Sequence, residues 1–439
     1  MNGKVTALYL TTIVALHAVS AGVPERYTTL LTIAGKGEQE DGNFWQTAFE
    51  DSNPLQVELS NPHSCGTDVF GRVYIVDKES HSILRVSADG STITTVAGTH
   101  VEGNGSDSSA LATDVQLRLP NGLHVFLDGS YLILDTDNQK VRHVTSNGVC
   151  STLFSYPSGF GAGRGLVATP DGLTVYFCGE YLSGTTQLVK KWQEDEITTI
   201  ASLPMGGRGL GNLDIAPDGA LFVTSVGDHR VYRIIEGSAP EIIAGNGLEE
   251  GNIATGSQAT QVALNRVRGI AILPDSSFFL ATQKGGDIWW VDNGPQNDGL
   301  ARRIHLFLNG ADNGNVISGD GLSRIGSIDR ISEPRAVHLA TNGDLIITTN
   351  DTGVIRAIRN VCKPTLPKLS LADGKLTWTS LAHESSWLEH STSLESNRWD
   401  LVSITERSEK EETLHSLDLP IESSKGFFRL QVPTLAGGQ

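Results

Sequence analysis

The sequence lacks a long apolar run, an excess of basic residues and the short motifs that mark several enzyme classes. No apolar run reaches the ~20 residues of a membrane-spanning helix, so we expect no membrane span. The chain has 33 Lys and Arg against 50 Asp and Glu, and so acidic a protein repels phosphate backbones, which predicts no nucleic-acid partner. It contains no HExxH, Gly-x-Ser-x-Gly, P-loop or helix-opening GxGxxG motif, so we assign no catalytic residues.

What the sequence does contain is an internal repeat. A short apolar strand followed by Gly recurs at residues 32–35, 95–98 and 242–245. Looser copies of this strand end at Phe154, Ala201 and Leu308. Self-similarity of this kind predicts a repeat protein.

A second repeated block lies between these strands. It consists of a short apolar strand, an Asp-Gly or Asn-Gly turn, an apolar strand, a polar loop and a third apolar strand, as in the copy that contains Pro120 and Gly129. Such dipeptides between apolar runs are strong hairpin signals, because Asn, Asp and Gly tolerate positive φ. The six copies of the block start at Pro62, Pro120, Gly163, Leu210, Val267 and Pro334.

Six such units, each completed by one recurrent outer strand, predict an all-β fold, a six-bladed β-propeller. The outer strand at Leu30 to Ala34 precedes the first unit, whereas the last unit, which ends at Ile355 to Ile358, has no outer strand of its own. We therefore expect the N-terminal strand to complete the last blade. This arrangement closes the ring and removes exposed sheet edges.

These repeats resemble those of the NHL-repeat propellers. The family pattern runs Pro-x-Gly-apolar, Asp-Gly, apolar strand, Asp-x-x-Asn-x-x-apolar, apolar strand, then Thr-Val-Ala-Gly and a Gly- and Asp-rich linker. The copies around Pro62 and Pro120 match best, residues 135–138 carry the middle loop, and residues 318–321 are similar to the linker. The third and fifth copies depart from the pattern in the middle loop. The resemblance covers residues 28–362 and implies the fold, whereas one fold hosts many functions.

The two ends of the chain differ in character from the repeats. The first residues combine Lys4, a short apolar core and a small-residue cleavage site at Val19 to Ala21, which predicts a secretory signal and a secreted or periplasmic protein. The Leu-Thr-Trp strand at 376–378 and the Phe-Phe-Arg-Leu strand at 427–430 resemble the fibronectin-type-III-like modules of exported bacterial proteins. The expected division is a signal peptide at 1–21, a propeller at 22–362, a linker at 363–368, a small β domain at 369–432 and a tail at 433–439.

Equivalent positions of the six copies should form rings around the propeller axis. One residue after the start of each block, four copies carry a basic side chain, which concentrates positive potential at one mouth of the ring. Arginine suits bidentate capture of carboxylate, sulfate or phosphate. The alternative is that each arginine pairs with acidic residues of the linkers. The predicted ligand-binding residues are His63, Arg164, Arg268 and Arg335.

Three residues further on, three polar side chains alternate with small or apolar ones. Two imidazoles and one carboxylate are a competent ligand set for zinc or another divalent ion. The alternative is that these side chains pack between blades, where a hydrogen-bonded histidine is ordinary. The predicted metal ligands are His124, Asp214 and His338, and the metal would be zinc or calcium.

Three functional hypotheses follow from these patterns. The leading one is an exported, non-catalytic binding protein whose mouth takes an anionic small molecule, a glycan group or a protein. The second is a metal-dependent enzyme, because six-bladed propellers include lactone hydrolases and lyases, with the ring of His124, Asp214 and His338 activating a bound water. The third is a structural component of the envelope or matrix. Apart from that metal, we expect no cofactor.

Overall fold

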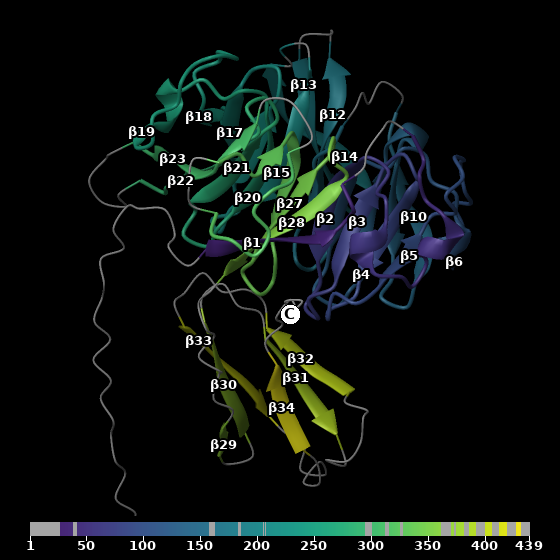
Figure 1. The fold of residues 1–439 in the computed structure, drawn as a ribbon. Coiled ribbons are helices and arrows are strands. Elements are labelled where there is room, and N and C mark those ends of the chain that lie inside the picture. Colours follow the sequence, from purple (N-terminus) through teal and green to yellow (C-terminus); the bar gives the residue numbers. More distant parts are fainter. Residues whose placement is uncertain are drawn as a thin grey trace, which may run out of the picture.

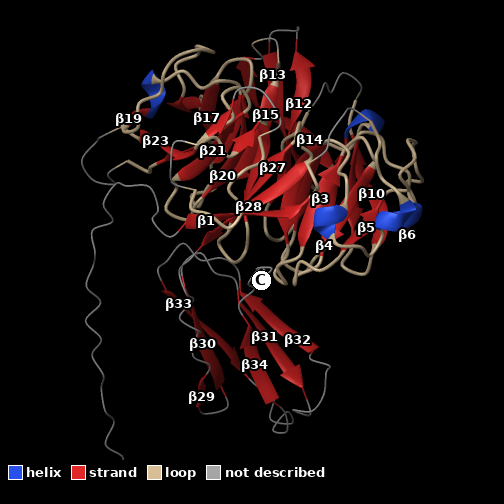
Figure 2. Ribbon diagram, viewed as in Figure 1, coloured by secondary structure: helices blue, strands red, loops and turns tan. Residues whose placement is uncertain are grey.

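A computed structural model describes the chain at residues 27–37, 42–157, 163–182, 186–204, 206, 208–294, 301–311, 316–324 and 328–360, and at six C-terminal strands. Strands and loops dominate this part of the chain, with only short helical turns (Figure 2). Among the described residues, no helix is long and apolar enough to cross a membrane. The signal peptide, the linker at 363–368 and the tail lie outside the described residues.

Up to Asn360, the described strands form six antiparallel sheets that lie side by side as the blades of a propeller (Figure 1). Each of the first five blades follows the chain from an innermost to an outer strand. The expected six-bladed all-β fold is therefore confirmed. Blade 1 contains β2 (Pro62–Thr67), β3 (Val73–Asp77), β4 (Ser82–Val86) and β5 (Ile93–Ala97); blade 2 contains β7 (Gly122–Val125), β8 (Tyr131–Asp135), β9 (Lys140–Val144) and β10 (Val149–Ser155); blade 3 contains β11 (Leu166–Ala168), β12 (Thr174–Leu182), β13 (Thr186–Gln193) and β14 (Glu196–Pro204).

The remaining blades repeat this plan, and two short strands add to it. β6 (Ala110–Leu111) extends blade 2 beyond β10, and β19 (Ser257–Gln258) extends blade 5 beyond its outer strand, neither of which the repeats predicted. Blade 4 contains β15 (Leu210–Ile215), β16 (Leu221–Ser225), β17 (Arg230–Ile234) and β18 (Glu241–Ala244); blade 5 contains β20 (Val267–Ile272), β21 (Phe278–Thr282), β22 (Ile288–Val291) and β23 (Arg303–Leu308); blade 6 contains β26 (Pro334–Leu339), β27 (Leu345–Thr349) and β28 (Val354–Asn360). A short parallel pair, β24 (Gly310–Ala311) and β25 (Ile331–Ser332), lies between blades 5 and 6 in the sequence.

The N-terminal strand β1 (Tyr27–Ala34) completes blade 6, as expected (Figure 1). It runs antiparallel to β28, with Leu30 opposite Ile358 and Leu31 opposite Ala357. Leu30 is fully buried in an apolar cluster that also contains Ile347 and Ile358. The chain thus closes the propeller by pairing segments more than 300 residues apart in sequence.

The innermost strands pack against one another in the cyclic order β2, β7, β11, β15, β20, β26 and back to β2. Glycine permits this approach at two points. A Cβ at Gly122 would lie 2.7 Å from the carbonyl oxygen of Arg164, and a Cβ at Gly211 would lie 2.6 Å from that of Arg268. Both separations are shorter than real Cβ contacts, so any side chain there displaces the next blade. The glycines therefore fix where two of the predicted arginines stand.

The turns that lead into the inner strands of blades 2 and 5 are also held by a neighbouring blade. The backbone N–H of Leu119 donates to Nδ1 of His81 at 3.2 Å, and that of Arg266 donates to Nδ1 of His229 at 3.3 Å. Both residues have positive φ, a conformation that side chains other than glycine rarely adopt. A residue with positive φ stands immediately before the start of five of the six repeated blocks: Asn61, Leu119, Gly209, Arg266 and Glu333.

The C-terminal strands form two three-stranded sheets, in the orders β29-β30-β33 and β32-β31-β34. The strands expected at 376–378 and 427–430 lie within two of them, and Glu412–Asp418 was not expected. The small β domain and its fibronectin-like character stay predictions. The strands are β29 (Ser370–Ala372), β30 (Lys375–Leu381), β31 (Ser386–Ser391), β32 (Asp400–Thr405), β33 (Glu412–Asp418) and β34 (Phe427–Gln431).

Two equivalent aspartates at the ends of β3 and β8 have different surroundings. Asp135 forms an ion pair with Arg142 at 3.1 Å, whereas blade 1 has Leu84 in place of that arginine. Oδ1 of Asp77 accepts the backbone N–H of Ser60 at 2.6 Å, and its buried Oδ2 has no hydrogen-bond partner among the described residues. Burial raises the pKa of Asp77 to about 7.

We predict that removing β1 opens the ring. Deleting residues 22–35 exposes the edge of β28 and the apolar side chains packed on β1, and each apolar side chain contributes ~1.5–3 kcal/mol. The melting temperature measured by circular dichroism should fall by well over ~5 °C. A control deletion of residues 22–26, which keeps β1, should melt like the full mature chain. Equal melting of the two deletion variants would contradict closure by β1.

We also predict a pH dependence that originates at Asp77. The folded state holds a proton on this carboxyl group up to about pH 7, whereas the unfolded chain releases it near ~4. The free energy of unfolding therefore falls as pH rises between these values, because the folded state binds more protons. Asp77→Asn should be more stable than the parent at pH 8 by ~2–4 kcal/mol, and the gain should shrink at pH 5.

Urea denaturation at both pH values measures this difference. Asp195→Asn, in the exposed turn between β13 and β14, serves as the control and should follow the parent at both pH values. A gain from Asp77→Asn that is the same at pH 5 and pH 8 would show that the carboxyl group does not titrate in this range.

Candidate ligand-binding site at the propeller axis

A cavity of about 500 Å³ lies at the axis and is lined by residues of all six innermost strands. Its walls include every member of the ring that lies four residues after the start of each block. The repeat register therefore identifies side chains and backbone that face one shared space. The ring members are Gly66, His124, Val167, Asp214, Ala271 and His338.

Arg268, on β20, lies where the inner strands begin and is not among the residues that line the cavity, whose wall on this strand starts at Ile270. Its side chain is 4% exposed, and its Nε and Nη1 atoms are buried without a hydrogen-bond partner among the described residues. Burial and then the charges of Arg164, Arg335 and Arg208 lower the pKa of Arg268. A guanidinium stays charged at neutral pH. The lowered pKa therefore means that a positive charge is held here at a cost in free energy.

Arg164, in blade 3, lines the cavity and places its own positive charge at the tunnel wall. Its charge acts on Arg268 in blade 5 and on His63 in blade 1, so alternate blades meet at the axis. Burial, followed by Arg164, Lys78 and Arg335, lowers the pKa of His63 well below its usual value. The imidazole is consequently neutral at pH 7, and its Nδ1 lies 2.9 Å from the carbonyl oxygen of Asn61.

Arg335 differs from Arg268 because acidic and amide groups surround it. Its Nη2 donates to Oδ1 of Asn350 at 2.6 Å and lies 3.2 Å from Oδ1 of Asp351 and 3.7 Å from Oε2 of Glu333. The pairing with linker and loop acids that the sequence offered as an alternative therefore applies to Arg335. Nε and Nη1 of Arg268 have no such partner among the described residues, and the more distant charge of Glu333 only opposes the lowering of its pKa. Arg208, which precedes β15, also contributes positive charge here and was not among the predicted residues.

The three predicted metal ligands line the cavity, but two of them are already bonded to neighbouring blades. Oδ2 of Asp214 accepts the backbone N–H of Ile272 at 2.8 Å, and Nε2 of His338 accepts that of Thr67 at 3.2 Å. His124 packs edge-on against Phe126 at 4.8 Å between ring centroids. Within the described residues, no group of three or more His, Cys, Asp or Glu is placed to hold a metal ion. The zinc or calcium site stays a prediction.

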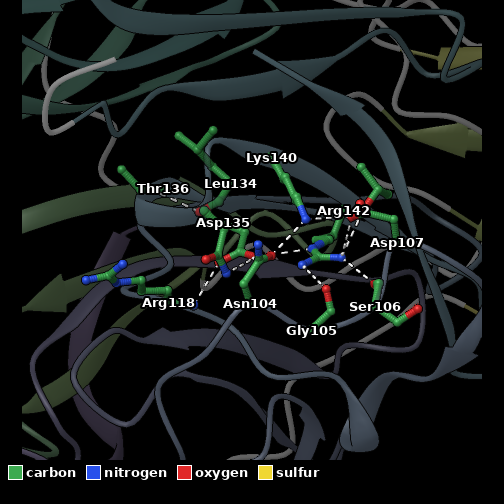
Figure 3. A network of polar contacts seen from close by, with 12 residues as sticks. Asn104, Gly105, Ser106, Asp107, Arg118, Leu134, Asp135, Thr136, Lys140 and Arg142 are labelled. Carbon is green, nitrogen blue, oxygen red and sulfur yellow. Dashed lines mark hydrogen bonds and ion pairs between the residues drawn. The ribbon is translucent and has the colours of Figure 1, made fainter. Parts of the chain in front are cut away.

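The Gly- and Asp-rich linker of blade 2 is held by a guanidinium (Figure 3). Arg142, fully buried on β9, donates from Nη1 to the carbonyl oxygen of Ser106 at 2.7 Å and from Nη2 to that of Gly105 at 3.1 Å. It also donates from Nε to Oδ2 of Asp135 at 3.1 Å, while Lys140 lies 2.6 Å from Asp107. These linker carbonyls and carboxylates thus have basic side chains as partners.

A second cavity, of about 670 Å³, opens between blades 2 and 3. We call it the side chamber. It shares His124, Val125, Ala168 and Pro170 with the wall of the tunnel. Its position follows from the packing of side chains between two blades, and the repeat pattern contained no signal for it.

The comparisons with known proteins agree with the fold. No family model matches the chain, and no curated protein matches it. Among solved structures, a protein of unknown function from Bacteroides thetaiotaomicron is similar, with a TM-score of 0.53, 15% identity and 75% of each chain covered. An auxiliary nutrient binding protein from the same species has a TM-score of 0.53, 14% identity and 76% of each chain covered. One from Bacteroides ovatus has a TM-score of 0.54 and 11% identity, covering 76% of this chain and 77% of its own.

We predict that Arg142 is essential to blade 2. Arg142→Leu, which copies the residue of blade 1, leaves the carboxylate of Asp135 buried without its cation and should lower the free energy of unfolding by ~3–5 kcal/mol. The double variant Arg142→Leu with Asp135→Asn removes both charges and should recover part of that loss. Urea denaturation of the parent and the two variants measures this. If the double variant were no more stable than the single one, the ion pair would not be the cause.

Proposed function

We propose that this protein is a non-catalytic binding protein that captures an anionic small molecule, or an anionic group of a glycan, where the inner strands begin. The observation that carries the proposal is Arg268, which is buried and has two guanidinium nitrogens without a hydrogen-bond partner in the part of the chain that the structure describes. Buried polar groups in proteins are almost always hydrogen-bonded. An oxyanion seated against Arg268 and Arg164 would supply both the acceptors and the opposite charge.

The electrostatics of the mouth support the same proposal. The whole chain carries a net charge of −17, yet the charges of Arg164, Arg335 and Arg208 lie near enough to Arg268 to lower its pKa. Like charges so arranged destabilise the empty protein, and an anion relieves that cost. The two Bacteroides propellers described as auxiliary nutrient binding proteins have this fold, which is compatible with a capture role but does not name the ligand.

The other two hypotheses receive no comparable support from the described residues. A metal-dependent lactone hydrolase or lyase would use His124, Asp214 and His338, and in the latter two the atoms suited to a metal make hydrogen bonds to neighbouring strands. A structural role in the envelope or matrix gives no reason for an uncompensated buried arginine. Secretion also stays a prediction.

We predict that Arg268→Gln abolishes anion binding without harming the fold. Charge-assisted hydrogen bonds contribute ~1.5–3 kcal/mol each, so losing two should weaken binding by about 100-fold or more. The melting temperature of the empty protein should stay equal or rise, because the variant removes an uncompensated charge. Titration calorimetry with uronic acids, sulfate, phosphate and citrate, at low and high salt, measures the binding, which should fall with ionic strength.

The matched control is Arg303→Gln, which makes the same charge change at an exposed position of the outer strand β23 in the same blade. It should bind like the parent. Should no anion bind in a manner sensitive to Arg268→Gln, or should the empty Arg268→Gln protein melt well below the parent, the arginine would be structural and the proposal would be wrong.

A further inference from the structure

The side chamber has mainly apolar walls and lies beside the end of the tunnel opposite the arginines. It is formed by the turns that follow β7 and β11 and by outer strand β10. Phe126, Leu127, Leu153 and Pro170 contribute apolar surface to it. Ligand pockets are typically apolar with a few placed polar groups. Here Arg164 lies at one end of the tunnel, whereas the chamber beside the other end combines these apolar side chains with the carboxylates of Asp128 and Asp171.

Between its two ends, the tunnel wall has few polar groups that a ligand could bind. Both carboxylate oxygens of Asp214 accept backbone N–H groups, from Ile215 at 2.9 Å and from Ile272 at 2.8 Å. The imidazole of His124 packs edge-on against the ring of Phe126, at 4.8 Å between ring centroids. Apolar side chains, among them Val167 and Ile270, make up much of the remaining wall.

The two ends of the tunnel lie a defined distance apart. Arg268 precedes Leu273, which lines the far end of the cavity, by five residues along β20 and the residue that follows it. An extended strand rises ~3.3 Å per residue, so the charged end and the far end lie ~16 Å apart. The tunnel wall that continues into the side chamber is formed by His124, Val125, Ala168 and Pro170.

From these three observations we infer that the ligand is an amphipathic organic acid. Its anionic group binds at Arg164 and Arg268, its apolar body runs along the tunnel, and its apolar end enters the side chamber between blades 2 and 3. This inference rests on the proposed function and adds the chemical class of the ligand. Two kinds of recognition then act together, charge at one end and burial of apolar surface at the other.

The test uses a series of carboxylates of increasing chain length: acetate, hexanoate and decanoate, each below its aggregation concentration. Burying one methylene contributes ~0.8 kcal/mol, so affinity measured by titration calorimetry should rise about threefold to fourfold per buried methylene. Phe126→Ser and Leu153→Ser, both at half-buried positions in the chamber, should each weaken decanoate binding about tenfold. Neither variant should change the binding of acetate.

Leu173→Ser is the matched control, because Leu173 lies in the adjacent turn, is 67% exposed and does not line either cavity. It should bind all three acids like the parent. Arg268→Gln should lose the entire series. This last comparison separates the head-group site from the chamber.

The outcomes distinguish the two proposals. Equal affinity for acetate and decanoate, with binding still lost in Arg268→Gln, would overturn the amphipathic ligand and leave the anion site intact. A gain with chain length that Phe126→Ser and Leu153→Ser do not reduce would place the chain elsewhere and would also overturn it. Binding of any acid that is indifferent to Arg268→Gln would overturn the proposed function and this inference together.

Discussion

The close packing of six innermost strands around one axis is the constraint on which the rest of this structure depends. Gly122 and Gly211 leave no room for a side chain against the neighbouring blade, so the strands meet backbone to backbone. The ring closes only because β1 pairs with β28, which also leaves blade 6 without an open edge. Once closed, the ring forces residues of the same repeat register to face one another, whatever their charge.

Because of this closure, positive charges lie close together at the mouth of the tunnel. Arg268 is the second residue of β20 in blade 5, and Arg164 lies two residues before β11 in blade 3. The ring brings the charges of Arg164 and Arg335 within range of Arg268. A protein selected for stability alone would avoid this arrangement, because buried charge without a partner is expensive. Local violations of folding rules tend to occur at functional sites. Within the described ranges, Nε and Nη1 of Arg268 have no partner, which is such a violation. The buried guanidinium of Arg142 donates from all three of its nitrogens, so the same fold can provide partners for a buried arginine.

The sequence predicted the architecture and the register well, because both follow from local patterns. Turn dipeptides, apolar runs and the missing sixth outer strand were sufficient to predict six blades and closure by residues 30–34. Counting from the start of each block also found residues that line the axial cavity, among them His124, Asp214 and His338. Periodicity failed at Glu412–Asp418, because Leu414 and Leu417 are three residues apart and do not alternate as strand residues usually do.

The electrostatics of the site could not be predicted in the same way. Whether Arg335 is compensated depends on Asp351 in the loop between β27 and β28, and whether His63 is charged depends on its burial beside arginines of other blades. The partners of Asp214 and His338 are backbone groups of the adjacent blade, which no repeat register identifies. The side chamber arises from the packing of Phe126 and Leu153 between blades. All of these properties belong to the assembled ring.

The central claim is that an anion from outside the chain binds Arg268 and neutralises its charge. Anomalous X-ray diffraction from crystals of the mature protein soaked in selenate tests it directly, because the selenium atom marks the position of a bound oxyanion. The account predicts a strong anomalous peak within hydrogen-bonding reach of Nε and Nη1 of Arg268, next to Arg164. Selenate peaks found only at exposed arginines such as Arg303, with the nitrogens of Arg268 bonded to groups of the protein itself, would contradict it.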